Sequence, residues 1–264
     1  METITSFQNP KVKNILLLQE KSRERKRQGL FVVEGKREIL LALEGGYNIH
    51  SLFLCGCLKP LSKQVEQKLP RQVKFYDLAK AVFDKLAYRE DSDGLIAVVE
   101  AKSNMLDKVR LSENPFIVVL EAVEKPGNLG AILRTVDAAQ VDAVVICDPL
   151  CDVYNPNAIR SSVGCLFTLQ IAVSTSEEVL TWLKHNGIKS FAAELQASRW
   201  YHEADMSKAC AVIMGTEANG LTDFWLKNSD ARIKIPMRGK IDSLNVSVST
   251  AVLTFEAMRQ RGFK

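Results

Sequence analysis

A series of short, almost uninterrupted apolar runs in the second part of the chain constrains its fold more than any other feature. These runs cover residues 116–120, 143–147, 166–173, 190–193 and 211–214. Runs without polar alternation indicate strands that are covered on both faces, as in parallel sheets. Helical patterns lie between several of them, and the clearest, residues 176–186, begins with acidic residues and stops at Gly187. We therefore expect a mainly parallel α/β sheet, which binds ligands at the carboxyl ends of its strands.

The N-terminal part of the chain alternates between shorter strand and helix patterns. A helix is predicted to start near Asn9-Pro10 and to run into the basic segment 21–27. Strands are expected at residues 30–33, 49–54, 73–76 and 94–99, and a helix is expected at residues 36–44. This alternation predicts a small α/β domain. Because residues 101–114 are polar and aperiodic and precede Pro115, we place the boundary there, between domains at residues 1–105 and 114–264.

Charge is distributed unevenly between these two parts. Residues 1–105 carry 18 Lys/Arg and 13 Asp/Glu, whereas the remainder carries 17 and 18. A basic part beside a nearly neutral one favours a polyanion-binding module attached to a catalytic domain. Within segment 21–27, Arg23, Arg25 and Arg27 are candidates for phosphate contacts. The alternative is a solvated helix face with local ion pairs to the interspersed glutamates.

Several classes of protein and site are excluded at this stage. No apolar run approaches the roughly 20 residues that span a bilayer, and the N-terminus lacks a secretory signal pattern, so we expect a cytoplasmic protein with no membrane partner. The six cysteines and three histidines lack the paired spacing of a zinc site. We expect ordinary reduced thiols and no metal.

Three polar, glycine-bearing loops each follow a predicted strand. In the first, residues 124–135, Pro126-Gly127 forces a turn and Asn128 suits a helix N-cap. The second covers residues 214–221, and the third, residues 233–247, leads into a last helix that begins near Asn245 or Ser247. None of the loops contains a P-loop or a dinucleotide-binding fingerprint. The lack of the fingerprint argues against a nucleotide-dependent oxidoreductase. These loops indicate an α/β enzyme with a polar site for a nucleotide-like ligand.

Taken together, the loops resemble the three motifs of the SpoU/TrmH family, RNA ribose 2'-O-methyltransferases of the SPOUT superfamily. The matching patterns are Asn128-x-Gly130-x3-Arg134-Thr135, then Gly215-Thr216-Glu217-x2-Gly220, then Ile235-Pro236-Met237-x-Gly239-x3-Ser243-Leu244-Asn245-Val246-Ser247. Residues 155–164 look like the intervening segment of the family. Near the N-terminus, Asn9-Pro10-x-Val12-Lys13 and residues 31–35 are similar to the RNA-binding extension of many ribosomal-RNA members.

This resemblance implies a fold, a cofactor and a partner. The C-terminal domain is expected to form an α/β sheet with a deep trefoil knot, a rare exception to the usual topology rules. The expected cofactor is S-adenosylmethionine, and the expected partners are RNA and a second copy of the chain, with the active site near the dimer interface. The residues implied for cofactor binding are Met214, Gly215, Ile235, Leu244, Asn245 and Ser247.

The resemblance also implies catalytic roles for Arg134, Asn128, Glu217 and Asn245. Family mechanisms make the arginine a proton acceptor, but its pKa above about 12 argues against a free base. We expect Arg134 to orient a phosphate and stabilise the developing alkoxide. Asn128 would position Arg134 or the ribose, Glu217 would supply charge complementarity or stabilise a turn, and Asn245 would cap the last helix, touch substrate, or both.

The predicted function is methyl transfer to a ribose 2'-hydroxyl of ribosomal RNA. The N-terminal extension favours ribosomal RNA, and transfer RNA is the alternative substrate. A catalytically silent RNA-binding protein on the same fold is the non-enzymatic alternative. Arg160, in the intervening segment, is expected either to bind RNA or to form a surface salt bridge.

Overall fold

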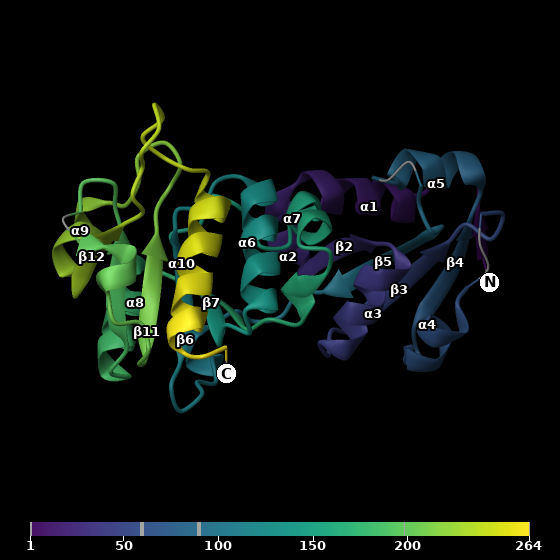
Figure 1. Ribbon diagram of the computed structural model, residues 1–264. Helices are drawn as coiled ribbons and strands as arrows, with labels where there is room; N and C mark the ends of the chain where they lie inside the picture. Colours follow the sequence, from purple (N-terminus) through teal and green to yellow (C-terminus); the bar gives the residue numbers. More distant parts are fainter. Residues whose placement is uncertain (1, 59–60, 89–90, 198, 264) are drawn as a thin grey trace. The chain divides into compact units, whose positions relative to one another are not determined.

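The computed structural model describes residues 2–58, 61–88, 91–197 and 199–263 (Figure 1). The chain divides into two compact units. Unit 1 contains residues 1–103 together with residues 152–168, and unit 2 contains residues 104–151 and 169–264. The first unit therefore includes a segment from the middle of the chain, which no local pattern in the sequence indicated.

Unit 1 contains a mixed five-stranded sheet in the order β1-β4-β3-β5-β2. Its strands are β1 (Glu2–Ile4), β2 (Leu30–Glu34), β3 (Ile49–Leu54), β4 (Lys74–Leu78) and β5 (Leu95–Glu100). Strands β1, β4 and β3 run parallel, and β5 pairs antiparallel with both β3 and β2. This sheet confirms the predicted small N-terminal α/β fold, including the β3 bounds.

The helices of unit 1 are α1 (Pro10–Glu20), α2 (Ser22–Gln28), α3 (Lys36–Glu44), α4 (Lys63–Lys68), α5 (Lys80–Leu86) and α7 (Pro156–Ser161), with a 3₁₀ turn at Cys165–Phe167. The side chain of Asn9 caps α1 by accepting a hydrogen bond from the amide of Lys11. The predicted single helix is interrupted, because Lys21 adopts an extended backbone between α1 and α2.

Unit 2 is built on a seven-stranded sheet in which every pair of neighbours is parallel, in the order β10-β12-β9-β11-β6-β7-β8. Its strands are β6 (Phe116–Glu121), β7 (Ala143–Cys147), β8 (Ile171–Ser174), β9 (Lys189–Ala193), β10 (Arg199–Trp200), β11 (Cys210–Met214) and β12 (Ala231–Lys234). Strands β6, β7 and β11 are buried along their whole length. The expectation of a parallel α/β sheet is confirmed.

The helices of unit 2 are α6 (Pro126–Ala138), α8 (Ser176–His185), α9 (Asp223–Asn228) and α10 (Val246–Gln260), with 3₁₀ turns at Leu106–Lys108 and Tyr201–Glu203. Helices α6 and α10 pack against each other, and α8 contacts β7, β9 and α9 (Figure 1). Trp225 of α9 is fully buried, and its indole N–H donates to Ser176 at the start of α8. This contact joins two helices that cover the core of the sheet.

One predicted strand, residues 166–173, is correct only in its last three residues, which belong to β8. Residues 166–173 form a 3₁₀ turn in unit 1 followed by β8 in unit 2. Leu166 and Phe167 are apolar because they are buried in unit 1, where the Phe167 ring packs against Tyr47 at 5.1 Å between centroids. An apolar run indicates that its residues are buried, but it does not distinguish a buried turn from a buried strand. Among the described residues, no helix is long and apolar enough to cross a membrane.

Candidate active site

Three polar loops begin where β6, β11 and β12 end. These strands share one parallel sheet, so their carboxyl ends lie at the same edge. The loop after β6 leads into α6, the loop after β11 leads to α9, and the loop after β12 leads into α10. The three glycine-bearing loops therefore begin at one edge of the sheet, as a single site would require.

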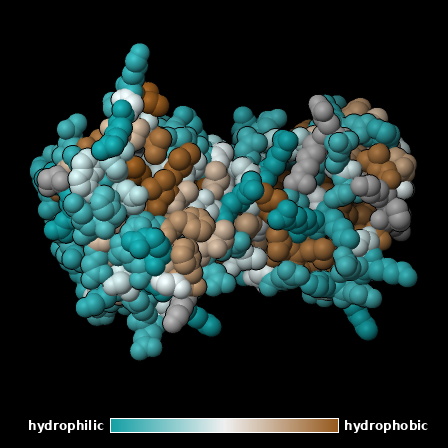
Figure 2. Space-filling view, viewed as in Figure 1, coloured by the Kyte–Doolittle hydropathy of each residue, from teal (hydrophilic) through white to brown (hydrophobic). Residues whose placement is uncertain are grey.

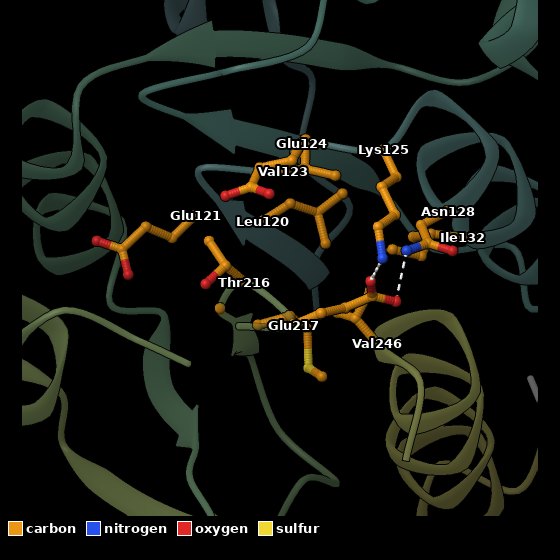
Figure 3. Close-up of a pocket in the computed structure, with 12 residues that line it drawn as sticks. Leu120, Glu121, Val123, Glu124, Lys125, Asn128, Ile132, Thr216, Glu217 and Val246 are labelled. Atoms are coloured by element: carbon orange, nitrogen blue, oxygen red, sulfur yellow. Dashed lines mark hydrogen bonds and ion pairs between the residues drawn. The ribbon is translucent and has the colours of Figure 1, made fainter. Parts of the chain in front are cut away.

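The carboxylate of Glu217 joins the three loops, and Figure 3 shows its contacts with Lys125 and Asn128 of the first loop. Its Oε1 accepts a hydrogen bond of 2.6 Å from the side-chain amide of Asn128 and another from the side-chain amide of Asn245. Its Oε2 accepts from the ammonium of Lys125. The Asn245 amide also donates to the Asn128 carbonyl at 3.3 Å. Three of the four expected catalytic residues therefore form one connected cluster, together with a lysine.

The Lys125 ammonium, and after it the Asn128 amide, hold the pKa of the Glu217 carboxyl below its usual value. The same contact raises the pKa of Lys125. Both groups are therefore charged at neutral pH, and the cluster is an ion pair flanked by two amides. Sequence reasoning missed Lys125. The one available signal was a cation placed at the start of a helix, where the macrodipole disfavours it.

The expected N-cap role of Asn128 is wrong. Helix α6 begins at Pro126, and Lys125 occupies the N-cap position without a side-chain capping bond. Proline suits the first helical position because the amide it lacks would have no partner there. Asn128 consequently lies within the first turn, and its side chain is free to reach Glu217.

The expected capping role of Asn245 is confirmed. Its Oδ1 accepts hydrogen bonds from the amide of Ser247 at 2.9 Å and from the Ser247 hydroxyl at 2.6 Å. Because its amide nitrogen meanwhile donates to Glu217, Asn245 links the start of α10 to the second loop. Ser247 reaches the cluster through this contact with Asn245.

The loop after β11 is held in one narrow conformation. Thr216 and Gly220 exchange backbone hydrogen bonds of 3.0 and 3.1 Å across it. A Cβ placed on Gly215 would lie 2.2 Å from the carbonyl carbon of Gly220, so only glycine fits there. Buried Glu121, at the end of β6, accepts from both the amide and the hydroxyl of Thr222. Glu121 is a second residue that sequence reasoning missed, because its partner lies on another strand connection.

A cavity of about 560 Å³ opens beside this loop. Its walls include four of the six residues expected to bind cofactor: Met214, Gly215, Ile235 and Leu244. Asn245 and Ser247 do not line it and belong to the adjoining polar cluster. Residues 214–217 and Val246 line both this cavity and the smaller pocket around Glu217, which Figure 3 shows. The cluster therefore borders the larger space.

Arg134 is not brought to this cluster within one chain. It is exposed on α6 and lines neither pocket. Six residues correspond to about one and two-thirds helical turns, so Arg134 and Asn128 project from different sides of α6. In the part of the chain that the structure describes, no hydrogen bond or ion pair of the Arg134 side chain is found.

The candidate RNA-binding arginines differ in their surroundings. Arg25 is 4% exposed, pairs with Asp152 and donates to the carbonyl of Leu18 at 2.7 Å, so its guanidinium faces the protein and not a polyanion. Arg23 and Arg27 are exposed, and Arg27 pairs with Glu24 of the same helix. This arrangement differs from the expectation that all three arginines face RNA, because the helix turns Arg25 inward.

Arg160 belongs to unit 1, in helix α7. Its exposed guanidinium donates to the backbone carbonyl of Tyr88 at 3.3 Å. Among the residues that the structure describes, no cluster of three or more His, Cys, Asp or Glu could hold a metal ion.

Known proteins are similar to this chain in both sequence and fold. A family model described as the SpoU rRNA methylase family matches residues 115–255, and one described as the MRM3-like substrate binding domain matches residues 9–97. The 23S rRNA (guanosine(2553)-2'-O)-methyltransferase RlmP of Bacillus subtilis is 29% identical over 97% of this chain and 98% of its own.

A second relative, the 23S rRNA (uridine(2479)-2'-O)-methyltransferase of Streptomyces viridochromogenes, is 30% identical over 90% of this chain and 85% of its own. The crystal structure of an rRNA methyltransferase from Sinorhizobium meliloti with bound S-adenosylmethionine covers 98% of this chain and 97% of that chain, with 29% identity and a TM-score of 0.89. The similarity therefore extends across both units.

Proposed function

Because the chain belongs to the SpoU rRNA methylase family, we propose that it transfers a methyl group from S-adenosylmethionine to a ribose 2'-hydroxyl of ribosomal RNA. The observation that carries this proposal is the convergence of three loops on Glu217, beside a cavity lined by four of the six expected cofactor residues. The names of the relatives support ribosomal RNA, since two of them are 23S rRNA 2'-O-methyltransferases.

The cavity suits S-adenosylmethionine. Its volume of about 560 Å³ lies within the range of about 300–1,000 Å³ that is usual for small-molecule sites. Apolar side chains such as Leu226 and Leu253 line it together with polar groups from residues 215–220. The bound cofactor would supply a methyl group activated by its sulfonium. The trefoil knot that the family forms around this site stays a prediction for this chain.

The residues of the cluster would act on the nucleotide. Asn128 and Asn245 have amide orientations that Glu217 selects, so they can orient the ribose whose 2'-oxygen attacks the methyl carbon. The hydroxyl proton must leave as the new bond forms. Arg134 would orient a phosphate and stabilise the developing alkoxide, and that phosphate or a water would take the proton.

We propose that the working form is a homodimer in which Arg134 contributes at the subunit interface. Helix α10 exposes Val248 (48%) and Phe255 (44%), which lie seven residues apart on one face, with the partly exposed Ala251 and Val252 between them. Figure 2 shows apolar surface gathered over this helix. An apolar face of helical period that is left in solvent supports helix packing between subunits.

Substrate selection is proposed to rest with the N-terminal domain, residues 1–105, and methyl transfer with residues 114–264. Arg23 and Arg27 from residues 1–105, and Arg160 from the segment 152–168 that belongs to the same unit 1, are the proposed RNA contacts, because their side chains are exposed. Arg25 leaves this set, because its role is structural. A protein that acts on ribosomal RNA would work in the cytoplasm of the cell.

The test is transfer of labelled methyl from S-adenosylmethionine to purified ribosomal RNA and, separately, to transfer RNA. Label on ribosomal RNA that protects the neighbouring phosphodiester from alkaline cleavage would support the proposal. Label on transfer RNA alone would show that the substrate is transfer RNA, while the proposed methyl transfer to a ribose would still hold. No transfer to ribosomal RNA or assembling subunits, despite cofactor binding, would favour a catalytically silent RNA-binding protein.

A further inference from the structure

Lys125 occupies a position that its own helix does not explain. It is the N-cap residue of α6, makes no capping bond with its side chain, and places a cation at the positive end of the helix dipole. Its side chain is 67% exposed, yet its ammonium is directed at one carboxylate, that of Glu217, 92 residues away in the chain. The contact therefore serves the loop after β11 and not the local stability of α6.

The two oxygens of Glu217 are used by different partners. The Lys125 ammonium contacts Oε2 and the Asn128 amide donates to Oε1 (Figure 3). The Asn245 amide also donates to Oε1. A carboxylate that is held at one oxygen presents the other in a defined direction. We propose that Lys125 is a positioning residue for methyl transfer, which holds the Glu217 carboxylate so that Glu217 orients the amides of Asn128 and Asn245.

The contact with Glu217 affects the orientation of the asparagine side-chain amides. The nitrogen and oxygen of an asparagine amide are nearly identical in size, so its hydrogen-bond partners decide which of them faces a ligand. Here Glu217 selects the nitrogen of both amides, and the Asn245 carbonyl is held by Ser247. A rotated Glu217 would release the Asn128 amide, and a donor would then replace an acceptor beside the ribose. Asn245 would lose its contact with Glu217 but would keep its orientation through Ser247.

The charges of the pocket add a second reason. Its described lining contains three carboxylates, Glu121, Glu124 and Glu217, and Lys125 is the cation among these lining residues. Lys234 and Asp242 line the adjoining cavity. Replacing Lys125 by a neutral residue removes the main contact that lowers the pKa of Glu217, so this pKa should rise and the carboxylate should lose the partner of its Oε2.

The inference rests on the proposed methyl transfer, and its test separates the two. Lys125→Ala and Lys125→Arg would be compared with Lys227→Ala, which removes an equally exposed lysine paired with Asp223 on α9. Lys125→Ala is expected to slow single-turnover methyl transfer by up to about 100-fold while the Kd for S-adenosylmethionine changes little. Lys125→Arg should retain most of the rate, and Lys227→Ala should match the wild type.

A double-mutant cycle identifies the route of the effect. If Lys125 acts through Glu217, Lys125→Ala costs nothing further in a Glu217→Gln background. The inference would be overturned if Lys125→Ala lowered the rate equally in both backgrounds and reduced the slope of RNA affinity against salt by about one. That result would show that Lys125 binds an RNA phosphate directly.

A measurement on the free protein does not require activity. Titration of the Glu217 carboxyl by ¹³C NMR should give a higher pKa in Lys125→Ala than in the wild type or in Lys227→Ala. An unchanged pKa would overturn the inference even if the enzyme methylates ribosomal RNA. A raised pKa in a protein without methyl transfer would instead reject the proposed function. If Lys125→Ala does not fold, Lys125→Gln provides the same comparison.

Discussion

Asn128 donates a hydrogen bond of 2.6 Å to Glu217, although 89 residues separate the two in the chain. This bond joins the start of α6 to the loop after β11. Asn245, at the start of α10, reaches the same oxygen of Glu217. One carboxylate therefore connects polar residues from three separate loops.

The first prediction concerns Glu217. Glu217→Gln should reduce methyl transfer by more than 100-fold, about the loss seen when a preorganised polar group is removed from an active site. The glutamine amide would place an N–H group where the carboxylate now accepts hydrogen bonds from Lys125, Asn128 and Asn245, so at least one of these donors would face another donor. Single-turnover kinetics at saturating cofactor measure the effect, and Glu177→Gln on the exposed side of α8 is the control. Equal rates for the two variants would contradict the assigned role.

Arg134 provides the second prediction. Arg134→Ala should abolish methyl transfer and leave S-adenosylmethionine binding largely intact, because Arg134 lines neither pocket of the same chain. Calorimetric titration with the cofactor and the labelled-methyl assay measure the two properties. Arg110→Ala, at another exposed arginine of unit 2, should behave as the wild type. Near-normal activity of Arg134→Ala would remove it from the mechanism.

The third prediction concerns the apolar face of α10. Phe255→Asp should convert the protein to a monomer and abolish activity, because a charge cannot be buried unpaired in a helix interface. Light scattering coupled to size-exclusion chromatography measures the mass. Phe263→Asp introduces the same change at another exposed phenylalanine and should leave the mass unchanged. A Phe255→Asp protein that stays dimeric would show that subunits associate elsewhere.

The fourth prediction concerns the ion pair between Arg25 and Asp152. Arg25→Ala should lower the free energy of unfolding by about 3–5 kcal/mol, because it leaves a nearly buried carboxylate without its cation. Urea denaturation measures the change. Arg27→Ala, which removes an exposed arginine from the same helix, should have little effect. Similar stabilities for the two variants would mean that the Asp152 pair is not structural.

The fifth prediction concerns RNA binding by unit 1. Neutralising Arg23 and Arg27 together should weaken RNA binding and reduce the slope of affinity against salt by about two, since each arginine would neutralise one phosphate. Binding titrations between low and physiological salt give the slope. Replacing Lys184 and Lys227 of unit 2 makes the same change in net charge and should leave the slope unaltered. An unchanged slope for the arginine pair would identify a solvated helix face.

Elements with a strong local pattern were predicted closely. The strand at residues 143–147 and the helix at residues 36–44 have the bounds that their sequences indicate. The strand predicted at residues 166–173 was right only for residues 171–173, since its first apolar residues are buried in unit 1 in a turn. Asn128 was assigned the wrong helix position because Pro126 begins α6 two residues earlier.

The sequence by itself determined the parallel α/β class, the three polar loops and the resemblance of their order to one family, because periodicity and motif spacing are properties of neighbouring residues. Only the tertiary structure decided that Lys125 pairs with Glu217, that Arg25 is buried against Asp152, and that residues 152–168 belong to unit 1. Each of these features depends on contacts between residues that are distant in the chain. The charge of a side chain does not indicate which of many possible partners it contacts in the folded protein.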